Sequence, residues 1–324
     1  MQTNLVNFIR RTAEDMRLRG QYSAAQTCLS VLRGLLGIAG KPVLLFSELT
    51  PALLKNYEHH LLGRERSRNT VSLYMRMLQN LCNRAMRMNL AQVPDDLFEN
   101  VFTGNEPVAH RAAPPEVIRK IRDAALTGKN SRLAFARDMF MLSFYLRGIP
   151  YIDLAHLRAC DLRDGFICYR RSKTGRRACV KLEPCALKII RRYASREKDT
   201  PYLLPIIRRN GSPGDEQRQY ESALRLYNKH LHRLAQVLDL GIRLTSYVAR
   251  HSWATIAHDI GVDVADISAA LCHSSEKMTR NYLRSFTPDR LAGVNRRVLQ
   301  AIRGNMNEDV PEKRRWKKGK IPNG

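Results

Sequence analysis

Apolar residues recur at intervals of three and four along most of the chain, a spacing that predicts amphipathic helices. In the N-terminal part this pattern predicts helices over residues 5–18, 24–39 and 67–88. A fourth helix is expected to begin at Pro51, because Thr50 supplies an N-cap hydroxyl and proline suits the first helical position. The sequence therefore predicts an N-terminal module of four helices.

The remainder of the chain is helical in pattern except for one segment with strand character. Residues 166–169 and 178–182 lie on either side of a turn that contains Gly175, which predicts a β-hairpin. The fold class predicted is mainly α with a small β-sheet. Helices are expected over 114–125, 132–146, 185–194, 216–238, 246–260, 263–271, 275–283 and 288–302, with a loop over 205–215.

A proline-containing stretch with little periodicity, residues 104–115, separates the two parts. We therefore expect a helical domain over 1–104, a linker over 105–115 and a larger domain over 116–302. Residues 303–324 are expected to form a disordered basic tail. This tail either contacts DNA or is a terminus surrounded by solvent, and the sequence favours neither alternative.

Charge narrows the class of partner. The 324 residues hold 55 Lys and Arg against 30 Asp and Glu, a net charge of +25. Residues 109–302 carry +17 of it, whereas the segments on either side carry +4 each. Since 44% of the residues are hydrophobic, we expect a folded protein. The excess of positive charge on a folded chain makes nucleic acid its leading partner. The sequence contains no long uncharged apolar run and no secretory signal, so we expect a cytoplasmic, nucleoid-associated protein.

The cysteines and the common catalytic motifs exclude several kinds of chemistry. Seven cysteines at irregular spacing, with no C-x-x-C pair, argue against a disulfide framework and a zinc site. The sequence has no phosphate-binding P-loop, HExxH pair or paired nuclease carboxylates. A protein that acts on DNA without metal needs another way to neutralise a phosphate, and arginine suits this role.

Two segments carry the most chemical information. The first contains Arg250-His251-Ser252-Trp253-Ala254-Thr255, and in the second His273 is followed nine residues later by Tyr282. In order and spacing they resemble the tyrosine recombinase (phage integrase) family, in which R-H-[ST]-x-A-[TS] precedes L-G-H-[SK]-S…Y. The resemblance implies a helical core-binding (SAM-like) domain and an α+β catalytic domain that together clamp duplex DNA.

The resemblance also implies a role for five residues. Tyr282 would attack the scissile phosphate and become joined to a DNA 3′-phosphate. Arg250 and Arg147 would hold its non-bridging oxygens, and His273 would donate a hydrogen bond to it. Lys173, in the predicted hairpin turn, would protonate the leaving 5′-oxygen, although an ordinary phosphate contact on a basic turn is the alternative. The family's chemistry needs no cofactor, neither ATP nor metal.

The chain departs from the family pattern at three positions. Tyr247 stands where the family usually has a histidine, three residues before Arg250, and its share in accepting the Tyr282 proton is open. Arg147 lies six residues before Asp153, where the family more often has three, as though the turn into the next helix were longer. Cys272 replaces the usual glycine before the histidine.

Partners follow from the charge and from the resemblance together. The resemblance implies double-stranded DNA, a homotetramer on two DNA sites and accessory DNA-bending proteins as partners. It also implies that the terminal helix, 288–302, docks on a neighbouring protomer, with packing inside its own chain as the alternative. Seven arginines are candidate DNA-phosphate contacts, for which a solvated surface is the alternative: Arg64, Arg66, Arg68, Arg76, Arg84, Arg87 and Arg176.

The function that the sequence favours is a site-specific DNA recombinase that cleaves and rejoins strands through a 3′-phosphotyrosine intermediate. Tyr247 and the spacing of Arg147 favour an alternative, a catalytically impaired DNA-binding protein of the same fold with an architectural or regulatory role. A type IB topoisomerase shares the chemistry, but the L-x-H-S-S…Y pattern speaks against it. The outcome, whether integration by a mobile element, inversion, resolution or transposition, is open.

Overall fold

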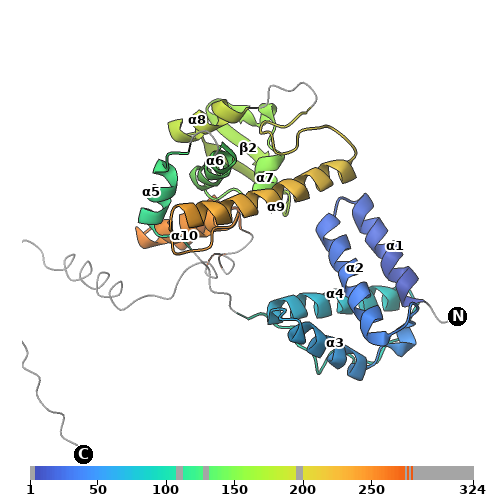
Figure 1. Cartoon of the computed structure of the whole chain (residues 1–324). Helices are drawn as coiled ribbons and strands as arrows, with labels where there is room; N and C mark the ends of the chain where they lie inside the picture. Colours follow the sequence, from blue (N-terminus) through green and yellow to red (C-terminus); the bar gives the residue numbers. More distant parts are fainter. Residues whose placement is uncertain are drawn as a thin grey trace, which may run out of the picture. The chain divides into compact units, whose positions relative to one another are not determined.

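A computed structural model describes residues 4–106, 112–126, 131–194, 200–273, 276 and 279 (Figure 1). Tyr282, the predicted helix over 288–302 and the basic tail over 303–324 lie outside the described residues. So do residues 107–111 of the predicted linker and most of the helix expected over 275–283.

The N-terminal module consists of four α-helices, as the sequence predicts. They are α1 (Leu5–Leu18), α2 (Tyr22–Ala39), α3 (Pro51–Gly63) and α4 (Arg68–Arg87), with a short 3₁₀ turn, η1 (Phe46–Glu48), before α3. The side chains of Asn4, Thr50 and Ser67 accept a hydrogen bond from the backbone N–H three residues on and so begin α1, α3 and α4. The apolar faces close a core of their own, which includes Leu35, Leu54, Tyr57, Met75 and Leu78.

The second module is built around α6 (Ser131–Tyr145), most of whose residues are buried. Helices α8 (Pro184–Tyr193), α9 (Pro213–Val237) and α10 (Val248–Asp259) pack on α6, as does α5 (Pro115–Asp123) (Figure 1). Shorter elements complete the module: α7 (Tyr151–Ala155), the 3₁₀ turn η3 (Ala159–Asp161) and α11 (Val264–Ala270). Its core is separate from that of the N-terminal module.

The sheet has three antiparallel strands in the order β1 (Leu162–Arg163), β2 (Phe166–Arg170) and β3 (Arg177–Lys181). The predicted hairpin is β2 and β3, whereas β1 has only two residues and no periodicity that would predict it. Along β2, Ile167 and Tyr169 point into the core and alternate with more exposed residues. The hairpin thus has one face on the core and one face in solvent.

A disulfide joins Cys168 of β2 to Cys179 of β3, which corrects the expectation that the cysteines form no disulfide framework. The two residues are direct partners in the strand register, with Cα atoms 4.1 Å apart, on the outer face of the hairpin. Only the register brings them together, because their spacing in the sequence matches no disulfide motif. Five cysteines are free in the structure: Cys28, Cys82, Cys160, Cys185 and Cys272.

A second correction concerns the start of α9. Residues 213–215 were expected to lie in a loop, yet the helix begins at Pro213. Ser212 and Asp215 form a capping box, in which the side chain of each accepts a hydrogen bond from the backbone N–H of the other. Proline is suited to the first helical position, because a backbone N–H there would have no partner within the helix. Among the residues described, no helix has the length and apolar character to cross a membrane.

Candidate active site

Arg250 lies in the first turn of α10 and is 4% exposed. Its Nη1 donates to the carbonyl oxygen of Gly148 at 2.9 Å, and its Nη2 donates to the carbonyl oxygen of Leu271 at 2.6 Å. Gly148 lies in the turn between α6 and α7, and Leu271 lies at the end of α11. The guanidinium therefore joins α10 to the end of the next helix, α11, and to the α6–α7 turn, 102 residues earlier in the sequence.

His273 follows α11 and meets this guanidinium. Its amide donates to the carbonyl of Ser268, and Cys272 before it has a φ of 51°, in the left-handed region that favours glycine. The turn orients the ring so that Nε2 lies 3.0 Å from Nη2 of Arg250, while Nδ1 lies 2.8 Å from Oγ1 of Thr279. Since a guanidinium only donates, Nε2 accepts, and Nδ1 carries the proton and donates to Thr279.

The same surroundings hold His273 neutral. Its pKa is lowered to about 4, first because burial disfavours the charged ring and then because Arg250, Arg171 and Lys173 repel a further positive charge. An approaching phosphate would offset these cations. The ring would then gain a proton on Nε2 more readily and could donate to a phosphate oxygen.

Arg147 is placed beside this pair by a tight turn. Arg147 and Gly148 both have positive φ values, 58° and 70°, and amides of the turn donate back to the end of α6. A methyl group on Gly148 would lie 2.6 Å from Cα of Arg250, so the two backbones are in close contact here. The turn from Leu146 to Pro150, before α7, accounts for the long spacing to Asp153.

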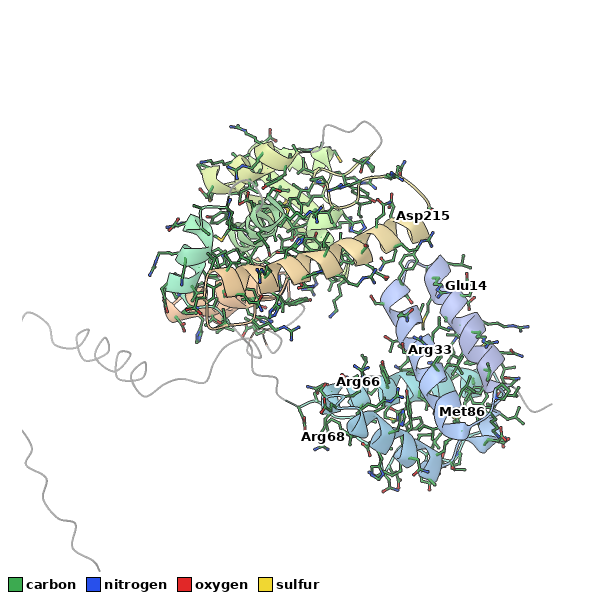
Figure 2. All side chains as sticks on the ribbon, in the orientation of Figure 1. Glu14, Arg33, Arg66, Arg68, Met86 and Asp215 are labelled. Carbon is green, nitrogen blue, oxygen red and sulfur yellow. A yellow bond between two sulfur atoms is a disulfide. The ribbon has the colours of Figure 1, made fainter. Side chains whose placement is uncertain are left out.

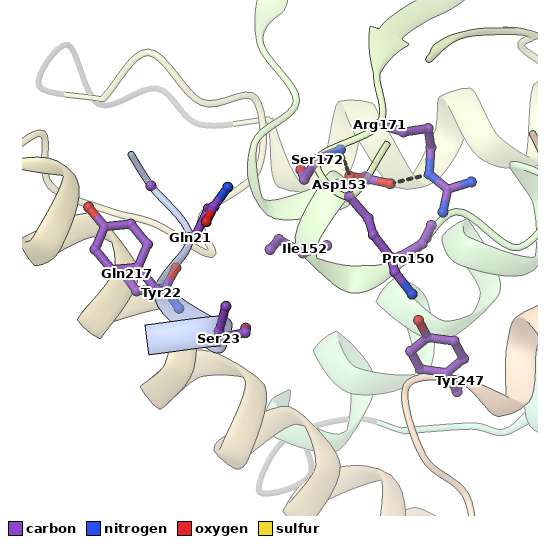
Figure 3. Close-up of a pocket in the computed structure, with 13 residues that line it drawn as sticks. Gln21, Tyr22, Ser23, Pro150, Ile152, Asp153, Arg171, Ser172, Gln217 and Tyr247 are labelled. Carbon is purple, nitrogen blue, oxygen red and sulfur yellow. Dashed lines mark hydrogen bonds and ion pairs between the residues drawn. The ribbon is translucent and has the colours of Figure 1, made fainter. Parts of the chain in front are cut away.

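Lys173 is exposed in the β2–β3 turn, and its positive charge helps to lower the pKa of His273. The buried carboxylate of Asp153 holds the base of this turn, because it accepts from the Ser172 amide at 2.8 Å and from Nε of Arg171 at 2.7 Å (Figure 3). Nη1 of Arg176, which we predict to contact DNA, donates to the carbonyl oxygen of His273 at 2.5 Å. The hairpin is thus tied to the segment that carries His273.

Tyr247 is the N-cap of α10 and is 49% exposed. Its ring centroid lies 5.8 Å from that of His251. Four of the six predicted site residues, Arg147, Lys173, Arg250 and His273, are therefore brought together by direct contacts or by their immediate neighbours. Tyr247 lies three residues before Arg250 at the start of the same helix, and Tyr282 lies outside the described residues.

Sequence reasoning named Asp153 only as the acidic residue of the family pattern that follows Arg147, and it did not single out two other residues that support this cluster, Arg171 and Thr279. A signal was available for Arg171, because the period-two alternation of β2 continues inward from Ile167 through Tyr169 to Arg171. No comparable pattern marks Thr279. Its contact with His273 is a hydrogen bond between two side chains, which the sequence does not reveal.

The predicted DNA contacts of the N-terminal module lie on α4 and on the loop before it. Arg66 and Arg68 lie near the start of α4 (Figure 2). Arg64 and Arg66 help to line a hollow together with Arg33, His60 and Tyr74. The other four make different contacts. Arg68 forms an ion pair with Glu106 and lies over the Phe102 ring, and Arg84 forms an ion pair with Asp15. Arg87 donates a hydrogen bond to the Asn83 carbonyl, whereas Arg76 is exposed.

The site brings together positively charged side chains that are also hydrogen-bond donors. The side chains of Arg147, Lys173 and Arg250 carry positive charge, and Asp153, the buried carboxylate beside them, is occupied by Arg171 and Ser172. Among the described residues, no group of three His, Cys, Asp or Glu side chains could hold a metal ion. This arrangement can bind a phosphodiester and stabilise charge that develops on its oxygens.

Comparison with known families assigns both modules to one class of protein, the phage integrases. The chain belongs to the phage integrase family: residues 114–288 match the family's catalytic domain, and residues 4–97 match the phage integrase SAM-like domain. The predicted family and the predicted fold class are confirmed.

Two curated relatives are tyrosine recombinases named XerA. Tyrosine recombinase XerA of Thermococcus kodakarensis is 28% identical over 193 residues, which cover 56% of this chain and 65% of the relative. The same enzyme of Pyrococcus horikoshii is 23% identical over 194 residues, covering 57% of this chain and 65% of the relative. The match therefore spans slightly less than two thirds of the length of these relatives.

Solved structures share the fold at low identity. A lambda integrase dimer bound to a COC′ core site has a TM-score of 0.61 and 14% identity, covering 96% of this chain and 100% of that chain. A Tn1549 transposon integrase in complex with transposon right-end DNA also has a TM-score of 0.61, with 13% identity, and covers 92% of this chain and 100% of that one. At this identity the likeness is one of fold.

Proposed function

We propose that the protein is a site-specific DNA recombinase that breaks and rejoins DNA strands through a covalent 3′-phosphotyrosine intermediate. The observation that carries the proposal is the buried Arg250–His273 pair, whose Nη2 and Nε2 atoms lie 3.0 Å apart beside the lysine-bearing hairpin. Tyr282 follows His273 by nine residues, as in the family pattern. The relatives named tyrosine recombinase XerA support the same activity.

In the first step, the Tyr282 oxygen attacks phosphorus, and the bond from phosphorus to the 5′-oxygen breaks. Arg250 and Arg147 stabilise the negative charge that spreads over the non-bridging oxygens. Lys173 gives a proton to the leaving 5′-oxygen, and Tyr282 passes its own proton to solvent water, so that one proton is gained and one is lost. The 5′-hydroxyl of the partner strand then attacks the phosphotyrosine and restores a phosphodiester.

Tyr247 has a smaller part in this scheme. A phenol is a poor base at neutral pH. We propose that its hydroxyl, at the start of α10, donates a hydrogen bond to a phosphate oxygen or accepts one from the hydroxyl of Tyr282. We therefore assign it a hydrogen-bonding contribution without proton transfer.

Duplex DNA is the proposed partner, with protomers acting as a tetramer on two sites. Structural neighbours include a lambda integrase dimer on a core site and a lambda integrase tetramer bound to a Holliday junction, a four-way DNA junction. The domain division proposed is 1–104, 105–115 and 116–302, with a basic tail from 303. The arginine-lined hollow of the N-terminal module supplies contacts to the DNA backbone.

The proposal is tested with a nicked suicide substrate that carries the cognate site. The wild-type protein is expected to form a covalent protein–DNA adduct, whereas Tyr282→Phe is expected to form none, because the nucleophilic oxygen is missing. An adduct formed by Tyr282→Phe would refute the assignment of the nucleophile. Specific DNA binding by the wild-type protein without any adduct would favour the alternative, a DNA-binding protein that has lost catalysis.

A further inference from the structure

We infer that Arg171 is a positioning residue for the reaction: it holds the turn that carries Lys173 in register with the Arg250–His273 pair. The inference rests on the proposed function, since it gives Lys173 the role of proton donor. It concerns a residue that touches neither the proposed phosphate position nor Lys173 itself.

Arg171 is buried, and its guanidinium donates in two directions. It is 8% exposed, and its Nε donates to Oδ2 of Asp153 at 2.7 Å. On the other side of the guanidinium, Nη1 donates to the carbonyl oxygen of Leu271 at 2.7 Å. A planar guanidinium bridges two acceptors in different directions, which a lysine ammonium on a flexible stem does far less well.

The Leu271 carbonyl is the point at which the two halves of the site meet. It accepts from Nη1 of Arg171 at 2.7 Å and from Nη2 of Arg250 at 2.6 Å. Nη2 of Arg250 also donates to His273, two residues after Leu271. Two guanidinium groups are therefore fixed on one oxygen atom, one from the hairpin and one from α10.

The backbone of Arg171 closes the turn itself. Its amide donates to the carbonyl of Arg176 at 2.9 Å, and its own carbonyl accepts from the amides of Thr174 at 3.3 Å and Gly175 at 2.8 Å. Lys173 lies inside this closed turn. Any movement of the Arg171 side chain relative to Leu271 is thus passed directly to the segment that carries the lysine.

Charge argues against a direct role for Arg171 on DNA. Its guanidinium is balanced by the buried Asp153 carboxylate, to which it is ion-paired at 2.7 Å. Arg170 and Arg177, which are register partners on β2 and β3, are exposed to solvent. Arg171 instead points inward from the end of β2.

The test separates loss of the proton donor from loss of the fold. Cleavage is measured on two substrates, one with the ordinary 5′-oxygen and one with sulfur at that position, because a thiolate leaves without needing a proton. Arg171→Gln is expected to lower cleavage of the oxygen substrate by about 100-fold, as for a displacement of roughly 1 Å. Cleavage of the sulfur substrate is expected to stay close to the wild-type rate.

Four further variants distinguish a positioning role from a structural one. Lys173→Ala should show the same preference for sulfur, and the double variant should cleave the oxygen substrate no more slowly than Lys173→Ala alone. Arg171→Lys, which keeps the charge but not the bridge, should behave like Arg171→Gln and guards against misfolding of the latter. Arg177→Gln is the matched control and should leave the sulfur-to-oxygen ratio unchanged.

Two outcomes overturn different claims. Equal losses on both substrates for both Arg171 variants would show that the residue only supports the fold, and the inference would fail while the proposed function stood. No adduct from the wild-type protein on either substrate would instead refute the proposed function.

Discussion

Replacement of Gly148 by alanine tests the close approach between the α6–α7 turn and Arg250. Gly148 has a φ of 70°, and a Cβ atom built there lies 2.6 Å from Cα, 2.8 Å from Cγ and 2.9 Å from Cβ of Arg250. The nearest of these is a backbone atom, so no simple change of rotamer relieves the contact. The turn or the first part of α10 must move.

Two effects add to lower the stability of the Gly148→Ala variant. The left-handed conformation costs alanine about 1–2 kcal/mol relative to glycine. Overpacking against a buried neighbour adds about 1–3 kcal/mol. Gly165 is the matched control, since its φ is 76° and no atom lies within 4 Å of the added Cβ. Gly165→Ala is therefore destabilised only by the left-handed conformation. Any effect of alanine on the unfolded chain is the same in both variants.

We therefore expect Gly148→Ala to lower the free energy of unfolding by about 1–3 kcal/mol more than Gly165→Ala does. Urea unfolding followed by circular dichroism measures the difference, with equal m-values as a check on comparability. Strand cleavage by Gly148→Ala should also fall by about 100-fold, because Arg250 is displaced from the phosphate. Equal stabilities and equal cleavage rates for the two variants would refute the close contact and the reasoning built on it.

Three other predictions concern separate features. The pKa of His273 is about 4 in the folded protein and near ~6.5 when unfolded, so the unfolded state takes up the proton first and stability should fall as the pH drops through this interval. His273→Asn should flatten that dependence in pH-resolved unfolding, and parallel curves would contradict it. Reduction of the Cys168–Cys179 disulfide opens a short loop and should cost up to about 3 kcal/mol in unfolding experiments, with no effect of reductant on a double alanine variant; a wild-type protein insensitive to reductant would exclude a stabilising bridge. The buried hydroxyl of Tyr227 has no hydrogen-bond partner among the described residues, so Tyr227→Phe should leave stability unchanged or raise it by about 1 kcal/mol, and a clear loss of stability would show an unseen partner.

The helices could be predicted from the sequence because their signals are local. Thr50-Pro51 and Ser67 mark the starts of α3 and α4, and the apolar stripes fix their lengths. The signal failed where composition misled: Pro213 and Gly214 suggest a loop, although Ser212 and Asp215 form a capping box around them. Strand β1 is too short for any periodicity to show.

The candidate site could be predicted only as a set of residue types. The motif singles out Arg250 and His273, but their contact depends on the left-handed turn at Cys272, which spacing does not reveal. The roles of Asp153 and Arg171 depend on tertiary hydrogen bonds to Ser172 and Leu271. Pairing of Cys168 with Cys179 likewise needs the strand register, a non-local property.

The N-terminal helices and the second module each enclose a core of their own. Substitutions within residues 4–106 can therefore be compensated by neighbours in that module without repacking α6 and the elements around it. Under the proposed function, preference for a DNA sequence can change in one module while the chemistry in the other is kept. The chain is built so that its target and its reaction can evolve at different rates.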